Sequence, residues 1–268
     1  MKILKDKIVL VTGGASGIGE IMCQLLIERG ANIIIWDINS DNLELLNLKY
    51  SSLGKLTTMK VDVSSISQIN IAAKEVINVF GGIDLLINNA GIIVGNYFHE
   101  HSEADITNTL SINANAPIYI THAFLDNMLL RNSGHICNIA SSGGLLSNPK
   151  MSVYVATKWS LIGFSDSLRL EMEQLKKNIN VTTIMPYYIN TGMFNGVKSK
   201  IPILDPETTA LRIIKAIEKN KKMVSIPGYI YRVTRFAQAI LPISIFDWFT
   251  GNVLGVYKTM EHFTGRKA

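Results

Sequence analysis

Short runs of apolar, mostly β-branched residues recur along the first 227 residues, and segments with apolar residues at every third or fourth position separate them. The runs are typical of buried parallel strands, which are covered on both faces. The spaced segments predict amphipathic helices. The predicted strands are residues 8–11, 33–36, 56–61, 83–87, 135–139, 180–185 and 222–227. This alternation predicts an α/β fold around a parallel sheet.

A second pattern begins after the last predicted strand. Residues 229–241 predict an amphipathic helix that Pro242 ends, and residues 243–249 form an aromatic-rich apolar segment. The predicted apolar face of the helix holds Ile230, Val233, Phe236, Ala237, Ile240 and Leu241, and the polar face Arg232, Arg235 and Gln238. Three interpretations stay open: packing on the protein's own core or on a dimer mate, a position in a membrane interface, and a cover over a lipophilic substrate.

Length and composition limit the class of protein. A chain of 268 residues that is 47% hydrophobic fits one large domain. We expect residues 1–227 to form the catalytic domain and residues 228–268 a helical extension of it. Two cysteines make no disulfide framework, and neither a signal peptide nor a long apolar window is found. We therefore expect a cytoplasmic protein, with peripheral membrane contact through 229–249 as an alternative.

The formal charge of +5 is unevenly distributed. Residues 221–268 carry seven cations and two acids, so the remainder of the chain is balanced. No nucleic-acid-binding motif accompanies the basic segment, and we expect no nucleic-acid partner.

The segment from Thr12 to Gly19 (TGGASGIG) stands between a predicted strand and a predicted helix. In that context glycines let the backbone approach a pyrophosphate, and the helix N-terminus supplies N–H donors and a positive dipole end. The simpler alternative is a tight turn. The candidate cofactor-binding residues here are Gly13, Ser16, Gly17, Ile18 and Gly19.

Asp37 ends the second predicted strand, about 20 residues beyond the glycine segment. A carboxylate at that place accepts hydrogen bonds from an adenosine ribose and repels a 2′-phosphate. The glycine segment holds no Arg or Lys, and Ile38 follows Asp37, so the sequence favours NAD over NADP. The alternative is a cap for the helix near Asp41. Asp62, followed by Val63, is a candidate for the adenine amino group or for an N-cap.

Tyr154 and Lys158 are four residues apart, so they project from one face of a helix. An ammonium favours the phenolate and is expected to lower the tyrosine pKa. Such a phenol can exchange a proton with an alcohol or a carbonyl. Ser141, thirteen residues before Tyr154, can hold the substrate oxygen; Ser142 is its neighbour and competitor. This is a proton-transfer site that needs a hydride carrier.

Together these motifs resemble the short-chain dehydrogenase/reductase family, from about residue 6 to about residue 220. The matching pieces are the glycine segment 12–19, Asp37, Asp62, the Asn-Asn-Ala-Gly of residues 88–91, Ser141, Tyr154 and Lys158. The resemblance implies a doubly wound, Rossmann-type three-layer sandwich with a seven-stranded parallel sheet. It also implies NAD(H) as cofactor and a homodimer or homotetramer built on the helices around 113–130 and 154–175.

The resemblance assigns further residues. Asn113 matches the family's fourth catalytic position, which helps to hold a water that links the lysine to solvent; Asn115 is a nearby competitor. Cofactor contacts are implied for Asn89, Ala90, Gly91, Tyr154, Lys158, Pro186, Ile189 and Thr191. Tyr187 stands where the family usually has glycine, and it is expected to shape the nicotinamide pocket.

Residues 192–204 occupy the place of the family's variable substrate lid, and their apolar content favours an apolar alcohol or carbonyl substrate. Local phrases such as Ile35-Trp36-Asp37-Ile38-Asn39 resemble the branch with 17-beta-hydroxysteroid and retinol dehydrogenases, which suggests a steroid, retinoid or long-chain alcohol. Two alternatives remain: an NADPH-dependent carbonyl reductase, and a membrane-surface protein that binds a dinucleotide without turnover.

Overall fold

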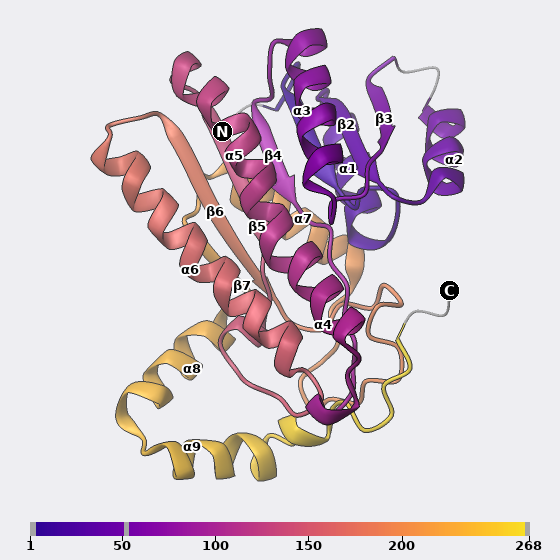
Figure 1. The fold of residues 1–268 in the computed structure, drawn as a ribbon. Coiled ribbons are helices and arrows are strands. Elements are labelled where there is room, and N and C mark those ends of the chain that lie inside the picture. Colours follow the sequence, from indigo (N-terminus) through magenta and orange to yellow (C-terminus); the bar gives the residue numbers. More distant parts are fainter. Residues whose placement is uncertain (1–3, 51–53, 266–268) are drawn as a thin grey trace.

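The computed structural model describes residues 4–50 and 54–265, which fold around one parallel seven-stranded sheet (Figure 1). The strand order is β3-β2-β1-β4-β5-β6-β7, and every neighbouring pair is parallel. The strands are β1 (Ile8–Thr12), β2 (Asn32–Asp37), β3 (Leu56–Lys60), β4 (Leu85–Asn88), β5 (Gly134–Ile139), β6 (Ile179–Pro186) and β7 (Met223–Ile226). The predicted fold class is confirmed, and all seven predicted strands are present.

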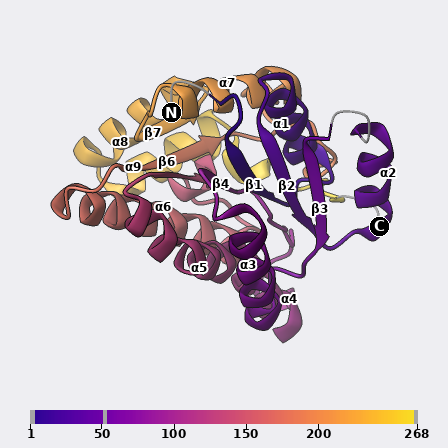
Figure 2. The ribbon, with the colours of Figure 1, turned by 90° about the horizontal axis from the view of Figure 1, so that it is seen from above.

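Helices cover both faces of the sheet, which gives three layers (Figure 2). One face is covered by α1 (Gly17–Glu28) and α7 (Pro206–Glu218). The other is covered by α3 (Ile66–Phe80), α5 (Ala116–Arg131) and α6 (Ser152–Gln174). The shorter α2 (Ser40–Tyr50) packs beside β3, and α4 (Glu103–Leu110) leads through a π-helical turn (Ser111–Asn115) into α5.

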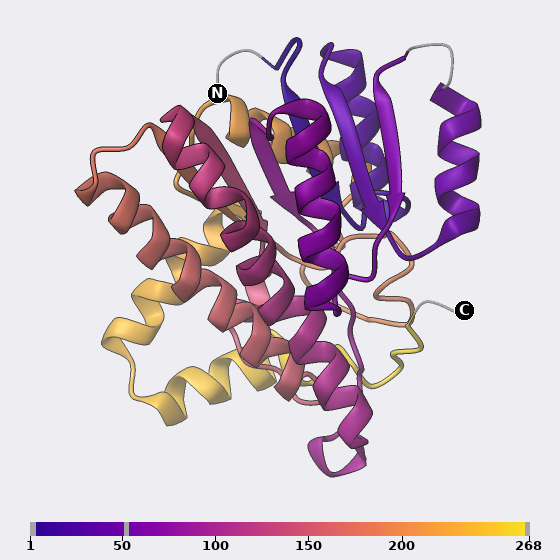
Figure 3. The ribbon, with the colours of Figure 1, turned by 45° about the horizontal axis from the view of Figure 1, so that its top comes forward.

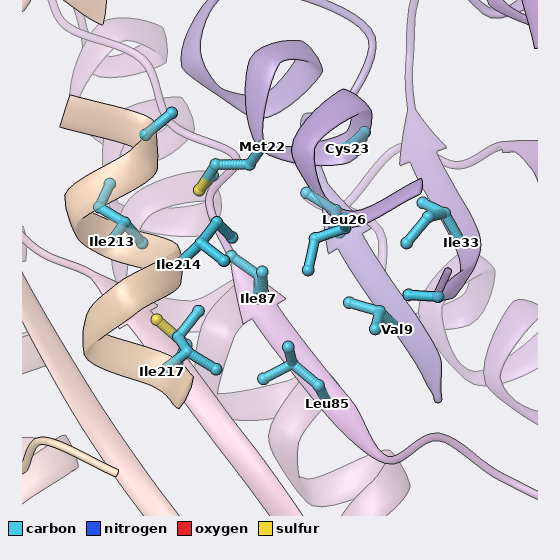
Figure 4. Close-up of a cluster of buried hydrophobic side chains, with 14 of the residues drawn as sticks. Val9, Met22, Cys23, Leu26, Ile33, Leu85, Ile87, Ile213, Ile214 and Ile217 are labelled. Atoms are coloured by element: carbon cyan, nitrogen blue, oxygen red, sulfur yellow. The ribbon is translucent and has the colours of Figure 1, made fainter. Parts of the chain in front are cut away.

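Alternation of side chains along the strands divides the core into two clusters. Successive residues of a strand point to opposite faces, so Val9 packs under α1 and α7 whereas Leu10 packs under the helices of the other face. Figure 4 shows the first cluster, where Leu26 of α1 and Ile214 of α7 converge on Val9 and Ile87. Because both sides of these strands are buried, they read as continuous apolar runs in the sequence.

Polar residues at the helix ends set where several helices begin and end. The Asp205 carboxylate accepts a hydrogen bond from the Thr208 amide (2.8 Å), and Pro206 occupies the first turn of α7, where it needs no backbone N–H. Ser65 caps α3 in the same way, and Gly81 ends that helix with a φ of 75°, a left-handed conformation that favours glycine.

The C-terminal extension contains the predicted amphipathic helix, but most of the apolar face of this helix is exposed. Its helices are α8 (Gly228–Ile240) and α9 (Ile243–Trp248), followed by a π-helical turn (Phe249–Val253) and a 3₁₀ turn (Val256–Lys258). Of the predicted apolar face of α8, Ile230 is buried whereas Val233, Phe236 and Ile240 are exposed. Only a narrow strip of α8 therefore packs on this chain. Among the described residues, no helix combines the length and apolar character that crossing a membrane would require.

Beyond α9 the chain returns to the body of the protein and packs against residues 192–204. The Lys198 amide donates to the Thr259 carbonyl (3.1 Å), and the Thr264 amide donates to the Asn195 carbonyl (2.9 Å). Met260 is buried between these contacts. Figure 1 shows the two segments side by side beyond the same edge of the sheet. The end of the described chain is thus a structural support of the predicted lid.

A buried polar network ties α6 to the centre of the sheet. The Asn88 side-chain amide donates to Asn138 Oδ1 (2.8 Å), and the Asn138 amide donates to Ser165 Oγ (2.8 Å). Ser165 in turn donates to the Leu161 carbonyl (2.6 Å). These bonds connect β4, β5 and α6, so they fix the helix that carries Tyr154 relative to the strand ends.

We predict that Asn138→Leu lowers the free energy of unfolding by about 1–3 kcal/mol, because a buried donor and a buried acceptor lose their partner. Denaturant unfolding followed by circular dichroism measures this change. The matched control is Asn70→Leu, at an exposed position of α3, which should stay within about 0.5 kcal/mol of the unsubstituted protein. Equal effects in the two variants would contradict a role for the network.

Candidate active site

A cavity opens where β1, β2, β4, β5 and β6 end, at the carboxyl edge of the sheet. Parallel strands bring their carboxyl ends to one edge, which is where ligands bind in such folds. Every residue that the sequence analysis assigns to the cofactor lines this cavity: Gly13, Ser16, Gly17, Ile18, Gly19, Asp37, Asp62, Val63, Asn89, Ala90, Gly91, Tyr154, Lys158, Pro186, Ile189 and Thr191. Their roles stay predictions, but the fold brings them together.

The glycine segment packs so closely on the end of β4 that side chains are excluded. Gly13 has a φ of 62°, and a Cβ there would lie 2.8 Å from the Ala90 Cα. A Cβ on Gly19 would collide with the Gly13 carbonyl oxygen. The helix α1 begins at Gly17 beside the cavity, so the amides of its first turn, which have no intrahelical partner, lie at the cavity wall.

Asn89 locks the glycine segment from the other side. Its side-chain amide donates to the carbonyls of Thr12 (3.0 Å) and Gly13 (2.9 Å). The Thr12 hydroxyl accepts from the amides of Asn89 (3.0 Å) and Ala90 (3.1 Å). The ends of β1 and β4 are therefore held as one rigid wall, in which Asn89 has a structural part besides its expected contact with a cofactor.

Asp37 lies at one end of the cavity and links two turns. Its Oδ2 accepts from the Ala15 amide (3.0 Å), and its Oδ1 accepts from the Asn39 amide (3.0 Å). These bonds orient the carboxylate at the position expected for ribose recognition. Lys158 is the only Lys or Arg among the described residues that line the cavity. A 2′-phosphate at the Asp37 end would therefore meet negative charge without a cationic partner.

Asp62 lines the cavity but does not cap α3. Its Oδ1 accepts from the Ser64 amide (2.9 Å) and the Ser64 hydroxyl (2.7 Å), and the N-cap is Ser65. The N-cap alternative for Asp62 is therefore wrong, because the helix begins after a further turn. Its carboxylate holds that turn at the edge of the cavity.

Ser141, Tyr154 and Lys158 converge in the same cavity, and all three are largely buried. Ser141 follows β5, and its Oγ accepts from the Gly143 amide (3.0 Å). Tyr154 and Lys158 lie on the first turns of α6, with the lysine Nζ 5.6 Å from the tyrosine ring centroid. The ammonium also donates to the Ile139 carbonyl (3.0 Å), so its position is fixed by the end of β5.

Burial shifts the pKa values of both Tyr154 and Lys158. Burial raises the pKa of Tyr154 to about 12, although its hydrogen bond with Ser141 acts in the opposite direction. Burial also lowers the pKa of Lys158 to about 8. The pKa of Tyr154 is therefore raised in the cofactor-free protein and not lowered as expected, because water is excluded from the phenol.

Asn113 lies behind the cavity wall, within the π-helical turn between α4 and α5. Its Oδ1 accepts from the Ile92 amide and its Nδ2 donates to the Ile92 carbonyl, both at 2.8 Å. A Cβ on Gly91 would lie 3.3 Å from Asn113 Oδ1 and 3.8 Å from Lys158 Nζ, so the asparagine and the lysine are close neighbours. Asn113 thus fixes the chain beside Lys158 instead of lining the cavity.

The end of the cavity near Tyr154 is aromatic and apolar. Phe194 of the lid meets the Tyr154 ring edge-on at 6.2 Å and the Tyr188 ring at 4.9 Å. Tyr187 packs on Tyr188 (4.6 Å) and shares a hydrogen bond with Ser199 Oγ (2.8 Å). Tyr187 therefore lines the cavity, as expected, and also ties the strand end to the lid.

Sequence reasoning missed two residues that support this aromatic group. Asn148 donates to the Tyr188 hydroxyl (3.0 Å) and to Thr259 Oγ1 (2.7 Å). Thr259 lies 111 residues from Asn148. No local signal in the sequence predicts this contact, because it depends on how the C-terminal segment returns.

The residues present fit a dinucleotide that spans the cavity. The glycine segment and the α1 N-terminus can hold a pyrophosphate, the Asp37 carboxylate can accept from ribose hydroxyls, and a nicotinamide end would lie at Tyr154. The exclusion of side chains at Gly13 and Gly19 keeps the backbone accessible there. Chemically, the site offers the Tyr154 phenol for proton transfer and the Ser141 hydroxyl for a hydrogen bond, beside an apolar pocket.

We predict that the charge on Lys158 destabilises the cofactor-free protein below pH 8. Its pKa falls from 10.5 to about 8 on folding, so between these pH values the unfolded chain binds more protons and the free energy of unfolding rises with pH. The contribution is about 3 kcal/mol. Lys158→Met should be the more stable protein near pH 7, and its advantage should shrink towards pH 10.

Urea unfolding of the cofactor-free protein at several pH values measures this difference. The control is Lys74→Met at an exposed position of α3, which should follow the unsubstituted protein throughout. If the free energies of unfolding of Lys158→Met and the unsubstituted protein differ by the same amount from pH 7 to pH 10, Lys158 keeps an ordinary pKa.

A family model and two curated relatives that match this chain are all described as dehydrogenases. The family model described as short chain dehydrogenase matches residues 7–202. Epidermal retinol dehydrogenase 2 of Mus musculus is 33% identical over 273 residues, which cover 99% of this chain and 88% of the relative. Estradiol 17-beta-dehydrogenase 11 of Pongo abelii is 32% identical over 244 residues, covering 90% and 81%.

Solved structures share the fold. A short chain dehydrogenase/reductase from Burkholderia phymatum in complex with NAD superposes with a TM-score of 0.81 at 22% identity, covering 89% of this chain and 95% of that one. A metagenomic short-chain oxidoreductase in complex with NADP gives 0.71 at 24% identity, covering 83% and 95%. From the family match over most of its length and from these relatives, the chain belongs to the short-chain dehydrogenase/reductase family.

Proposed function

We propose that the protein is an NAD(H)-dependent oxidoreductase that interconverts a lipophilic alcohol, of the steroid, retinoid or long-chain type, and its carbonyl. One observation carries the proposal: Ser141, Tyr154 and Lys158 converge at the apolar end of a cavity whose other end has the features of a dinucleotide site. Membership of an oxidoreductase family gives the reaction class. The cofactor form, the residue roles and the substrate class are our inferences.

In the proposed mechanism, a bound nicotinamide ring supplies or accepts the hydride and, when oxidised, adds a positive charge to the site. Tyr154 handles the proton. Its raised pKa keeps the phenol protonated near neutral pH, so it is a proton donor to a carbonyl oxygen during reduction. During oxidation the phenol must take the alcohol proton, which the protein favours only when positive charge is nearby.

Lys158 and Ser141 support this transfer. Below about pH 8 Lys158 is charged, and its Nζ, held by the Ile139 carbonyl, stays close to the tyrosine ring. It therefore favours the phenolate whenever that form arises. Ser141 Oγ, already fixed by the Gly143 amide, would donate a hydrogen bond to the substrate oxygen. Asn113 would hold the neighbouring backbone and sustain a proton path from Lys158 to solvent.

Two features support NAD as the cofactor. The Asp37 carboxylate is held by the amides of Ala15 and Asn39, so it cannot easily turn away from a ribose. The cavity around it offers no Lys or Arg among its described residues to neutralise a 2′-phosphate. Repulsion therefore disfavours NADP more than NAD.

An apolar substrate is supported by the apolar lining of the cavity. Ile92, Ile112, Met193 and Phe194 line the cavity, and Tyr187 closes it from the end of β6. Burying a lipophilic group there is favourable by about 25 cal/mol per Å² of apolar surface. Relatives named retinol and estradiol dehydrogenases agree with this class of substrate.

We further propose a homodimer or homotetramer in the cytoplasm. The exposed side chains of Tyr119 on α5 and Trp159 on α6 offer apolar surface for helix packing between copies. Cys23 and Cys137 are both free and buried, which fits a reducing compartment.

The first test is Tyr154→Phe. It should lower kcat/KM for alcohol oxidation about a thousandfold, because the proton acceptor is removed. The NADH dissociation constant should stay within a factor of about three, because the ring remains. Spectrophotometric turnover of a panel of steroid, retinoid and short polar alcohols, with fluorescence titration of NADH, measures both quantities.

Ser141→Ala and Ser142→Ala form a matched pair for the same assay, because both serines are buried but only Ser141 lines the cavity. Only the first should lose activity strongly. Near-normal turnover by Tyr154→Phe would refute the proposed mechanism. Turnover confined to short polar alcohols would refute the proposed substrate class and leave the mechanism intact.

Cofactor choice is tested with Asp37→Asn. The substitution keeps an acceptor for the Ala15 amide but removes the charge. We expect the ratio of kcat/KM with NADP⁺ to that with NAD⁺ to rise about tenfold, which corresponds to ~1.4 kcal/mol of repulsion. Asp62→Asn, at the other carboxylate of the cavity, should leave the ratio unchanged. A strong NADP⁺ preference in the unsubstituted protein would refute the proposal.

A further inference from the structure

The helix α8 presents an apolar stripe that no part of the described chain covers. Tyr229, Val233, Phe236 and Ile240 are 52%, 58%, 67% and 60% exposed. At about 100° per residue these four positions fall within an arc of about 60° on the helix surface. Their spacing is therefore that of one continuous contact face, whereas Ile230 and Thr234 on the adjoining face are buried against the protein.

Apolar side chains are exposed on α9 as well. Ile243, Ile245 and Trp248 are at least half exposed, and Phe249 follows with a partly exposed ring. Figure 3 shows α8 and α9, in yellow, projecting beside α6 as an arm, on the side of the view opposite to the C-terminal label. Exposed apolar side chains gathered in this way on an amphipathic segment mark an interaction surface.

Next to the stripe lies a basic groove between α7, β7 and the start of α8. The cations that line it are Arg212, Lys215, Lys219, Lys221 and Arg232, and no Asp or Glu lines it. Within the described residues, none of these cations makes an ion pair, whereas nearby Glu218 and Glu173 are paired with Arg29 and with Arg169 and Lys222. The positive charge of the groove is thus not neutralised by the protein.

Arg232 joins the two features. It lines the groove, and on the helix surface it is the next position beyond Phe236 at the edge of the stripe. Arg235, one step further round, is instead directed towards the rings of Trp159 (6.0 Å) and Tyr231 (5.9 Å). A partner that covers the stripe would therefore meet apolar side chains beside unpaired positive charge.

We propose that the α8–α9 arm docks on an anionic lipid bilayer. Tyr229, Phe236 and Trp248 would enter the boundary between headgroups and acyl chains, and the basic groove would face the lipid phosphates. An amphipathic helix binds membranes through its buried apolar area together with attraction to anionic lipids. The charge of the groove selects this occupant, because a second copy of the chain would bring an equally basic groove to the interface.

The proposal deepens the proposed function, since a lipophilic alcohol is concentrated in membranes, but its test does not depend on activity. The full-length protein is mixed with vesicles of phosphatidylcholine alone or of phosphatidylcholine with phosphatidylglycerol, and floated in a density gradient. We expect flotation with the anionic vesicles and its loss on raising the salt concentration. In the same mixtures, brominated lipid should quench the Trp248 fluorescence, and Trp248→Phe should remove that quenching.

Matched variants identify the two parts of the surface. Val233→Ser/Phe236→Ser should abolish flotation, and the control Ile71→Ser/Val79→Ser, on similarly exposed positions of α3, should not. Lys219→Glu/Lys221→Glu should weaken partitioning by about tenfold or more. Lys74→Glu/Lys177→Glu, with the same change of net charge at other exposed sites, should change it little. Unchanged circular dichroism and NADH binding verify folding.

Three outcomes would overturn the inference. Absence of flotation with anionic vesicles would exclude lipid docking. If the arm variants and their controls lose flotation equally, the effect would come from net charge or solubility and not from the arm. If Val233→Ser/Phe236→Ser halves the oligomer mass in sedimentation and leaves flotation intact, a second copy of the chain covers the stripe. Flotation that persists alongside inactivity would support the docking and refute the proposed function separately.

Discussion

All seven strands of this protein run in the same direction, and the candidate site exists because of that constraint. Parallel strands end at one edge, so Gly13, Ala90, Ser141 and Pro186, which are far apart in the sequence, line one cavity. The crossover helices needed to join such strands then cover both faces of the sheet. The same arrangement supplies the α1 N-terminus and carries Tyr154 on α6.

The site is held mainly by polar contacts that are sealed from water. Asn89 fixes the end of β1 to the end of β4, the Asn88–Asn138–Ser165 network fixes α6, and the Ile139 carbonyl fixes Lys158. The buried side-chain amides of Asn88 and Asn138 are tolerated because each donates to a partner. Burial disfavours the charged forms of Tyr154 and Lys158, so it raises the pKa of the tyrosine and lowers that of the lysine. The proton affinities of Tyr154 and Lys158 are therefore set mainly by burial.

The sequence alone was enough for whatever depends on local pattern. The strands and helices follow from periodicity, and the gathering of the motif residues follows from parallel topology. Features that depend on contacts between distant segments, or on how deeply a side chain is buried, could not be predicted. Asx-type turn formation moved the cap from Asp62 to Ser65, and the direction of the Tyr154 pKa shift depends on how completely water is excluded.

The C-terminal segment gave the largest difference between pattern and structure. The sequence left open whether its apolar face packs on protein, lies in a membrane interface or covers a substrate; in the structure Val233 and Phe236 are exposed, while Met260, which has no such pattern, is buried against the lid. Periodicity identifies a face that avoids water but does not say what covers it. The partner of Met260 is set by the course of the chain beyond α9, which turns back through two short helical turns.

The lid packs against the last described residues of the chain, so the wall of the pocket is built separately from Ser141, Tyr154 and Lys158. Ser141 directly follows β5, and Tyr154 and Lys158 lie on α6. The walls around Phe194 depend instead on Asn148, Thr259 and Met260. Substitutions within the last turns of the protein can reshape the pocket without touching the proton-transfer group. The shape of the pocket and the position of Ser141, Tyr154 and Lys158 therefore depend on different parts of the described chain.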